Sequence, residues 1–178
     1  MKKLLFFLLI VPVFVAFDDN TDRPDLIPET INGKGVYILS VPAHPYEIVA
    51  TEELYLGTEQ SYTQQLKAFT EVRKVAAQDY DALLSRDGKH VHLIKYKTPT
   101  THRGEAIQYG NWHFFFLSTP IHATETVAQL DFDQTLGPDR DHLQLMTQLI
   151  EMLQQEERTF NAVTLDGKGS VTLLSLQP

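Results

Sequence analysis

Apolar and polar positions along this chain follow two different periods in succession. Val36–Val41 and Tyr46–Leu54 are rich in β-branched and aromatic residues, which is typical of strands. Further on, Leu66, Phe69 and Val72 recur at three-residue intervals, which predicts an amphipathic helix. The first part of the chain therefore predicts two strands followed by a helix.

Local signals mark the start of this helix and a hairpin after it. Ser61 followed by Gln64 is the sequence of a capping box, in which each side chain bonds the other residue's backbone N–H. Ala82–Ser85 and Val91–Tyr96 flank the dipeptide Asp87-Gly88, which favours a tight turn between two strands. Together these elements predict a ββαββ unit.

The same order of elements returns about 80 residues later. Residues 36–50 and 114–128 align at an offset of 78, with seven identities in the twelve positions from Leu39 and Leu117 onward. Asp141 and Gln144 repeat the capping box, and Asp166-Gly167 repeats the turn. We therefore predict an α+β fold made by tandem duplication of the ββαββ unit. Two copies that form a pseudo-two-fold pair would bury more than either small copy alone, and two independent beads are the alternative.

This interpretation divides the chain into five segments. They are a signal peptide (1–16), a flexible lead segment (17–34), repeat copy one (35–97), a linker (98–111) and repeat copy two (112–178).

The first residues have the pattern of an export signal. Lys2 and Lys3 precede the apolar run Leu4–Ala16, which is too short to span a bilayer comfortably, and acidic residues follow at once. We expect cleavage after Ala16, with an uncleaved anchor as the alternative. The prediction is a periplasmic or secreted protein without a membrane span after cleavage. Because the chain has no Cys, it has neither a disulfide nor a lipidated cysteine.

The net charge and the absence of known motifs disfavour several classes of partner and of enzyme. The net charge is −8, and it becomes −10 when Lys2 and Lys3 leave with the signal, so nucleic acid and anionic membranes are disfavoured as partners. The sequence has no phosphate-binding glycine loop, no dinucleotide fingerprint and no Gly-x-Ser-x-Gly. These absences favour a non-enzymatic protein.

One polar motif occurs in both copies. Ser40-x-Pro42-x-His44-x-x-Glu47 returns as a second motif made of Ser118, Pro120, His122 and Glu125. In a structural interpretation, Pro ends a strand, Ser or His bonds free backbone groups, and Glu is an exposed strand residue.

Two chemical interpretations of the motif compete with the structural one. A pseudo-two-fold axis that joined His44, Glu47, His122 and Glu125 would give four ligands for Zn²⁺ or another divalent metal. Hydrolysis by Ser, His and Glu is the other hypothesis, although known triads gather such residues from distant segments.

Other conspicuous residues occur in one copy only. His90 and His92 alternate along one strand, so they share a face that would suit a metal or simply face solvent. Trp112 lies beside an apolar run and is expected in the core or in a binding surface.

Part of the chain resembles a known group of proteins. Tyr46–Ala50, the helix and Tyr80–Leu84 resemble the pattern of small bacterial envelope α/β domains of the heavy-metal-binding type and of secreted proteins of the Bacteroidota type. The resemblance implies an envelope location and an α/β fold.

The resulting functional prediction is an exported binding or envelope interaction module. It would act through the groove between the copies or through a sheet edge, on a protein or small ligand, with self-association as one possibility. Divalent metal binding and hydrolysis of an unknown substrate are the alternatives.

Overall fold

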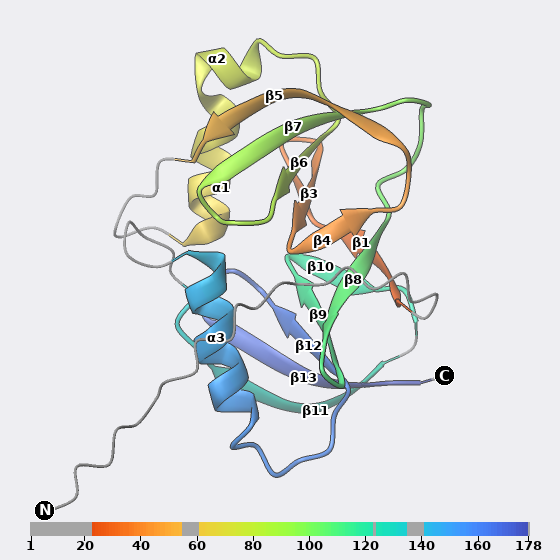
Figure 1. Ribbon diagram of the computed structural model, residues 1–178, viewed down its shortest axis with the longest axis vertical. Helices are drawn as coiled ribbons and strands as arrows, with labels where there is room; N and C mark the ends of the chain where they lie inside the picture. Colours follow the sequence, from red (N-terminus) through yellow and green to blue (C-terminus); the bar gives the residue numbers. More distant parts are fainter. Residues whose placement is uncertain (1–22, 55–60, 123, 135–140, 178) are drawn as a thin grey trace, which may run out of the picture.

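A computed structural model describes residues 23–54, 61–122, 124–134 and 141–177. The predicted signal peptide lies outside the described residues. The fold is mixed α+β, with most of the described chain in one large, open, mixed sheet and with three helices in the described part (Figure 1). The helices are α1 (Tyr62–Glu71), α2 (Arg73–Ala76) and α3 (His142–Leu153).

We call residues 23–97 the first half of the described chain and residues 98–177 the second half. The first half holds β1 (Asp25–Pro28), β2 (Thr30–Ile31), β3 (Lys34–Ile38), β4 (Ser40–Pro42), β5 (Tyr46–Glu53), β6 (Ala82–Ser85) and β7 (His90–Tyr96). The second half holds β8 (Gly104–Tyr109), β9 (Trp112–Phe116), β10 (Ser118–Pro120), β11 (Thr124–Asp131), β12 (Ala162–Leu165) and β13 (Ser170–Leu176).

The main layer of strands runs through both halves in the order β5-β7-β6-β3-β9-β12-β13-β11. The pairs β3·β6 and β9·β12 are parallel and the others are antiparallel. The halves meet at the centre of this layer, where Ile38 of β3 pairs with Phe116 of β9. The long strands β5 and β11 lie at its two ends.

A second, smaller layer joins the halves by crossed pairing. β4 of the first half pairs with β8 of the second, and β10 of the second half pairs with β1 of the first. β1 and β8 also pair with each other, and β8 continues into the main layer through β9. Each half therefore contributes a strand that pairs with a strand of the other half.

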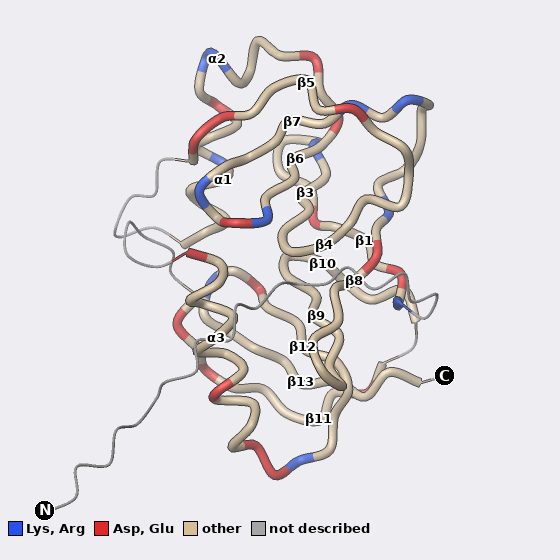
Figure 2. Tube along the Cα trace, in the orientation of Figure 1, with Lys and Arg blue, Asp and Glu red and all other residues tan. Residues whose placement is uncertain are grey.

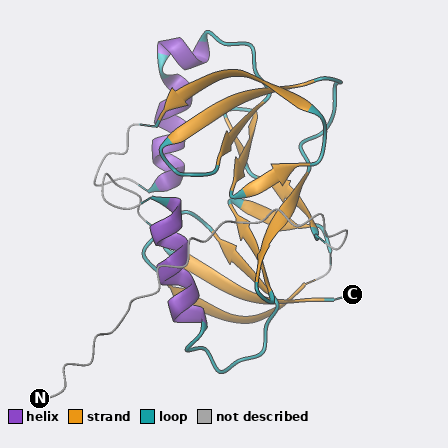
Figure 3. Cartoon of the chain, viewed as in Figure 1, coloured by secondary structure: helices purple, strands orange, loops and turns teal. Residues whose placement is uncertain are grey.

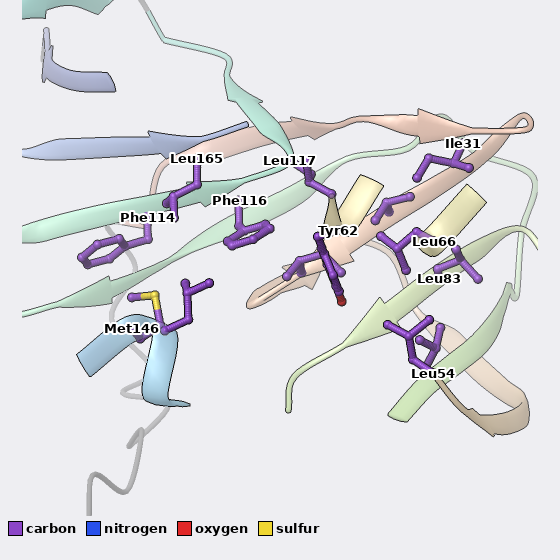
Figure 4. Packing of buried hydrophobic residues seen from close by; sticks show 14 of the residues in the cluster. Ile31, Leu54, Tyr62, Leu66, Leu83, Phe114, Phe116, Leu117, Met146 and Leu165 are labelled. Atoms are coloured by element: carbon purple, nitrogen blue, oxygen red, sulfur yellow. The ribbon is translucent and has the colours of Figure 1, made fainter. Parts of the chain in front are cut away.

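The helices cover one face of the main layer (Figure 3). Alternation along β3 and β9 sends Val36, Ile38, Phe114 and Phe116 toward this face, where they join the residues of α1 and α3 in one apolar cluster (Figure 4). Tyr37 and Phe115 point to the opposite face, which the second layer covers. The run Phe114–Leu117 is buried on both faces, since all four side chains are at most 1% exposed.

Both predicted capping boxes are present. Ser61 and Asp141 each accept a hydrogen bond from the backbone N–H three residues later, and Gln64 and Gln144 bond back to the cap residue. The two helix N-termini lie against each other, because the rings of Tyr62 and His142 are 5.4 Å apart and edge to face. The helices therefore meet end to end along one side of the molecule (Figure 1).

Two segments are more ordered than their polar sequences suggested. β1 and β2 lie in the expected lead segment, and β8 lies in the expected linker. Apolar and polar residues alternate only weakly in these segments. They form strands because they pair with strands that are distant in the sequence. The expected strand Val36–Val41 is also interrupted, because Leu39 has a φ of +47° and divides it into β3 and β4.

Several local details recur at corresponding positions of the two halves. Leu117 also has a φ of +47°, in the same place between β9 and β10. β5 and β11 each carry a register shift, after Ile48 and after Thr126, which are 78 residues apart. The crossed pairs match as well: Ser40 lies opposite Ala106, and Ser118 lies opposite Pro28.

Candidate functional site

The repeated motifs begin inside the second layer of strands. Ser40 opens β4 and Ser118 opens β10, and both side chains are buried. Within the described residues neither hydroxyl has a hydrogen-bond partner. A serine nucleophile needs a base within hydrogen-bond reach; among the described residues neither hydroxyl is bonded to one, and hydrolysis stays a prediction.

His44 is a half-buried packing residue. Its ring lies edge to face with Tyr96, at 6.3 Å between centroids. The Tyr96 hydroxyl lies 2.6 Å from that of Tyr37 and 3.3 Å from Nδ1 of His102. Tyr37 in turn donates to the carbonyl of Arg103. This network satisfies buried hydroxyl groups, and burial raises the pKa of both tyrosines.

The other residues of the metal hypothesis are at the surface. Glu47 and Glu125 lie exposed on β5 and β11, and His122 is exposed just before β11. Among the described residues, no group of three or more His, Asp or Glu side chains is placed to hold a metal ion. The structure therefore brings no metal centre together from His44, Glu47, His122 and Glu125, and zinc binding stays a prediction.

The single histidines and Trp112 have local partners. His90 forms an ion pair with Asp87, at 2.6 Å from Nδ1 to the carboxylate, and His92 bonds the Thr51 hydroxyl at 2.8 Å. Trp112 stacks on Phe160 at 5.6 Å. These contacts account for their positions within the fold.

A concave feature of the described surface lies between the helix α3 and the β8–β9 hairpin. We call it the α3 groove; its volume is about 590 Å³, which is in the range typical of small-molecule sites. Residues of the first half close one end, so the groove is shared by both halves. Its apolar wall consists of Leu39, Ile107, Tyr109, Leu143, Met146 and Ile150.

Two of these apolar side chains are exposed, and the other four are buried in the core cluster or packed against it. Leu143 is 56% exposed and Tyr109 is 39% exposed, although both are large. Leu143, Met146 and Ile150 recur at three- and four-residue spacing, so they form a stripe along α3. Met146 is buried and belongs to the core cluster together with Leu145 and Leu149, and Ile150 is half-buried against it. The stripe therefore runs from the exposed Leu143 to the edge of the core, and its outer part is uncovered.

The corresponding place in the first half is closed. Ile31, which is 78 residues before Tyr109, is only 6% exposed and packs in the core. Asn32 at the tip of the β2–β3 hairpin donates from Nδ2 to the Thr70 hydroxyl of α1, at 2.9 Å. In the second half, the Gln108 amide closes its own hairpin instead, by donating to the Gly110 carbonyl.

His142 lies beneath one end of the groove. It is the first residue of α3, is 1% exposed, and packs against Tyr62 and Phe116. Burial lowers the pKa of His142 to about 4, against the smaller opposing effects of the Arg86 backbone and of the carboxylates of Asp87 and Asp141. The imidazole is consequently neutral near pH 7 and adds no positive charge to the groove.

The residues of the groove were missed by the sequence analysis, although a signal for them exists. Thr63 and Thr70 of the first helix correspond to Leu143 and Ile150 of the second, 80 residues later. Glu29 likewise corresponds to Ile107. An apolar residue thus replaces a polar one at three positions that all line the groove. Differences between corresponding positions of the two halves therefore mark the groove more clearly than the identities do.

Comparison with known proteins adds no assignment. No protein-family model, curated protein or solved structure matches the chain. The resemblance to envelope α/β domains therefore stays a prediction. Within the described residues, every helix is too short or too polar to cross a bilayer.

Proposed function

We propose that this chain is an exported, non-enzymatic binding protein whose ligand occupies the α3 groove. The observation that carries the proposal is the open apolar wall of the groove, with Leu143 and Tyr109 exposed beside a volume of about 590 Å³. Exposure of such side chains is unfavourable in water, and ligand binding would remove it. The export signal predicted for residues 1–16 supports an extracytoplasmic location for this activity.

A duplication accounts for the origin of the site. The matched registers, the two leucines at positive φ and the paired capping boxes support two copies of one unit related by a pseudo-two-fold axis near the Ile38–Phe116 pair. In this interpretation both copies once had a hairpin beside a helix. The first copy kept this hairpin bonded to its helix, and the second opened it into a binding surface.

The proposal is tested with a neutral apolar fluorophore. N-phenyl-1-naphthylamine should bind the full chain, and its fluorescence should rise on leaving water. Replacing Leu143 and Ile150 by threonine, the residue that the first half carries at both places, should weaken binding by at least about tenfold, because the two substitutions remove apolar contact area. Binding should also shift the backbone amide signals of α3 and of the β8–β9 hairpin.

A matched control separates the groove from general apolar stickiness. Ile48 on β5 is 53% exposed and lies outside the groove, so Ile48→Thr should leave the affinity unchanged. If wild type fails to bind the fluorophore, or if Ile48→Thr weakens binding as much as the double substitution, the proposal is wrong.

A further inference from the structure

We propose that the natural ligand of the α3 groove is a cationic amphiphile, with its apolar body along α3 and its charged head between Tyr109 and Glu151. This inference rests on the proposed function and adds the chemical class of the ligand.

The apolar body is indicated by the shape of the wall. Leu143, Met146 and Ile150 form a continuous stripe over two turns of α3, and Ile107 lies on the opposite strand. A stripe of this kind suits an elongated apolar group better than a compact polar one, because its contacts are aliphatic along the whole length. Burial of such a group would supply the main part of the affinity.

The sign of the head group follows from the charges of the lining. Three carboxylates, Asp87, Asp141 and Glu151, line the groove, against the single guanidinium of Arg86. α3 itself carries no Lys or Arg, and Glu151 is its one charged residue (Figure 2). An anionic head would be repelled along this helix, whereas a cationic head would be attracted.

The two ends of the groove differ in how these charges are used. Asp141 caps α3 and forms an ion pair with Lys89 at 3.4 Å, and Asp87 bonds His90 and the backbone of its own turn. Both carboxylates at that end are thus engaged within the protein. Glu151 lies on the exposed side of α3 near the other end, where a ligand would meet it directly.

Tyr109 provides a second, independent feature that suits a cation. It lines the same groove as Ile150 and Glu151, and its side chain is 39% exposed. An aromatic face beside a carboxylate is a favourable environment for an ammonium group.

The test compares two surfactants with the same apolar chain and opposite charge. Decyltrimethylammonium and decanoate, each below its micellar concentration, compete with N-phenyl-1-naphthylamine for the full chain. The cation should displace the fluorophore at a concentration about tenfold lower than decanoate, and added salt should shrink this difference. Equal displacement by the two surfactants, or stronger displacement by decanoate, would overturn the inference.

Matched variants locate the preference in the groove. Glu151→Gln should reduce the advantage of the cation to about threefold or less, and Tyr109→Leu should reduce it further when combined with Glu151→Gln. Glu157→Gln removes the same charge from an exposed position outside the lining and should change nothing. An equal effect of Glu157→Gln would mean that general charge, and not the groove, selects the ligand.

The two proposals fail in different ways. A fluorophore that does not bind the groove removes the proposed function itself and the ligand class with it. A fluorophore that binds there and is displaced equally by both surfactants leaves the groove as a binding site and removes only the cationic preference.

Discussion

At the scale of single residues, His142 couples stability to pH. The unfolded chain should bind a proton on this histidine near its ordinary pKa of about 6.5, whereas the pKa in the folded protein is lowered to about 4 by burial. Between these values the unfolded state holds more protons, so the free energy of unfolding falls as the pH drops from about 6.5 to about 4. The full effect is about 3 kcal/mol, since each tenfold change in proton affinity corresponds to about 1.4 kcal/mol.

Chemical denaturation from pH 7 to pH 4 measures this effect. His142→Phe keeps an aromatic ring beside Tyr62 and removes the titrating group, so its stability should fall less steeply in this range. His122 is exposed, and His122→Phe should keep the wild-type slope. Asp87 and His90 titrate in all three proteins and cancel in the comparison. Parallel slopes for wild type and His142→Phe would show that burial of His142 does not control the pH dependence.

At the scale of elements, the Asp-Gly turn of each half packs against the start of the helix of the other half. Gly167, in the β12–β13 turn, has a φ of +69°, and a Cβ there would lie 2.8 Å from Leu117 and 3.0 Å from the Thr63 hydroxyl at the start of α1. Gly167→Ala should therefore lose about 3 kcal/mol of stability, because overpacking adds to backbone strain. Gly110 has a similar φ of +58° with open space around it, so Gly110→Ala should lose only about 1 kcal/mol. Urea denaturation of the two variants gives the comparison, and equal losses would show that the crossed contact is not tight.

The same scale shows what sequence patterns can reveal. The helices α1 and α3, the capping boxes and the Asp-Gly turns were predictable, because each depends on residues a few positions apart, such as Ser61 and Gln64. The break at Val72, which is extended and 51% exposed, was not, since the sequence analysis placed Val72 on the helix. β8 was not, because Gly104–Tyr109 is short and polar and becomes a strand only by pairing with β4, β1 and β9. The groove was missed for a related reason: whether Leu143 is covered depends on where a distant hairpin lies, and not on the period of its own helix.

At the scale of the whole molecule, the crossed strands and the shared core make the halves depend on each other. β4 pairs with β8, β10 pairs with β1, and one apolar cluster contains α1, α3 and both central strands. A separate first half would expose Ile38, which pairs with Phe116, and Tyr62, whose ring packs against Phe116 and His142. A small unit has a small hydrophobic core. The free energy lost when this surface is exposed should therefore exceed the free energy of unfolding of either half.

We therefore expect the full chain to unfold in a single transition and its halves to be unfolded when separated. Residues 23–97 and residues 98–178, produced as two polypeptides, should each give poorly dispersed amide spectra and no cooperative thermal transition. Mixing the two should restore dispersed signals, because the pairs β4·β8 and β1·β10 form between the polypeptides as readily as within one chain, apart from the entropy cost of association. If each half unfolds cooperatively when it is separated, the halves are independent beads. The groove that they share would then have no rigid frame to hold its first-half residues against α3.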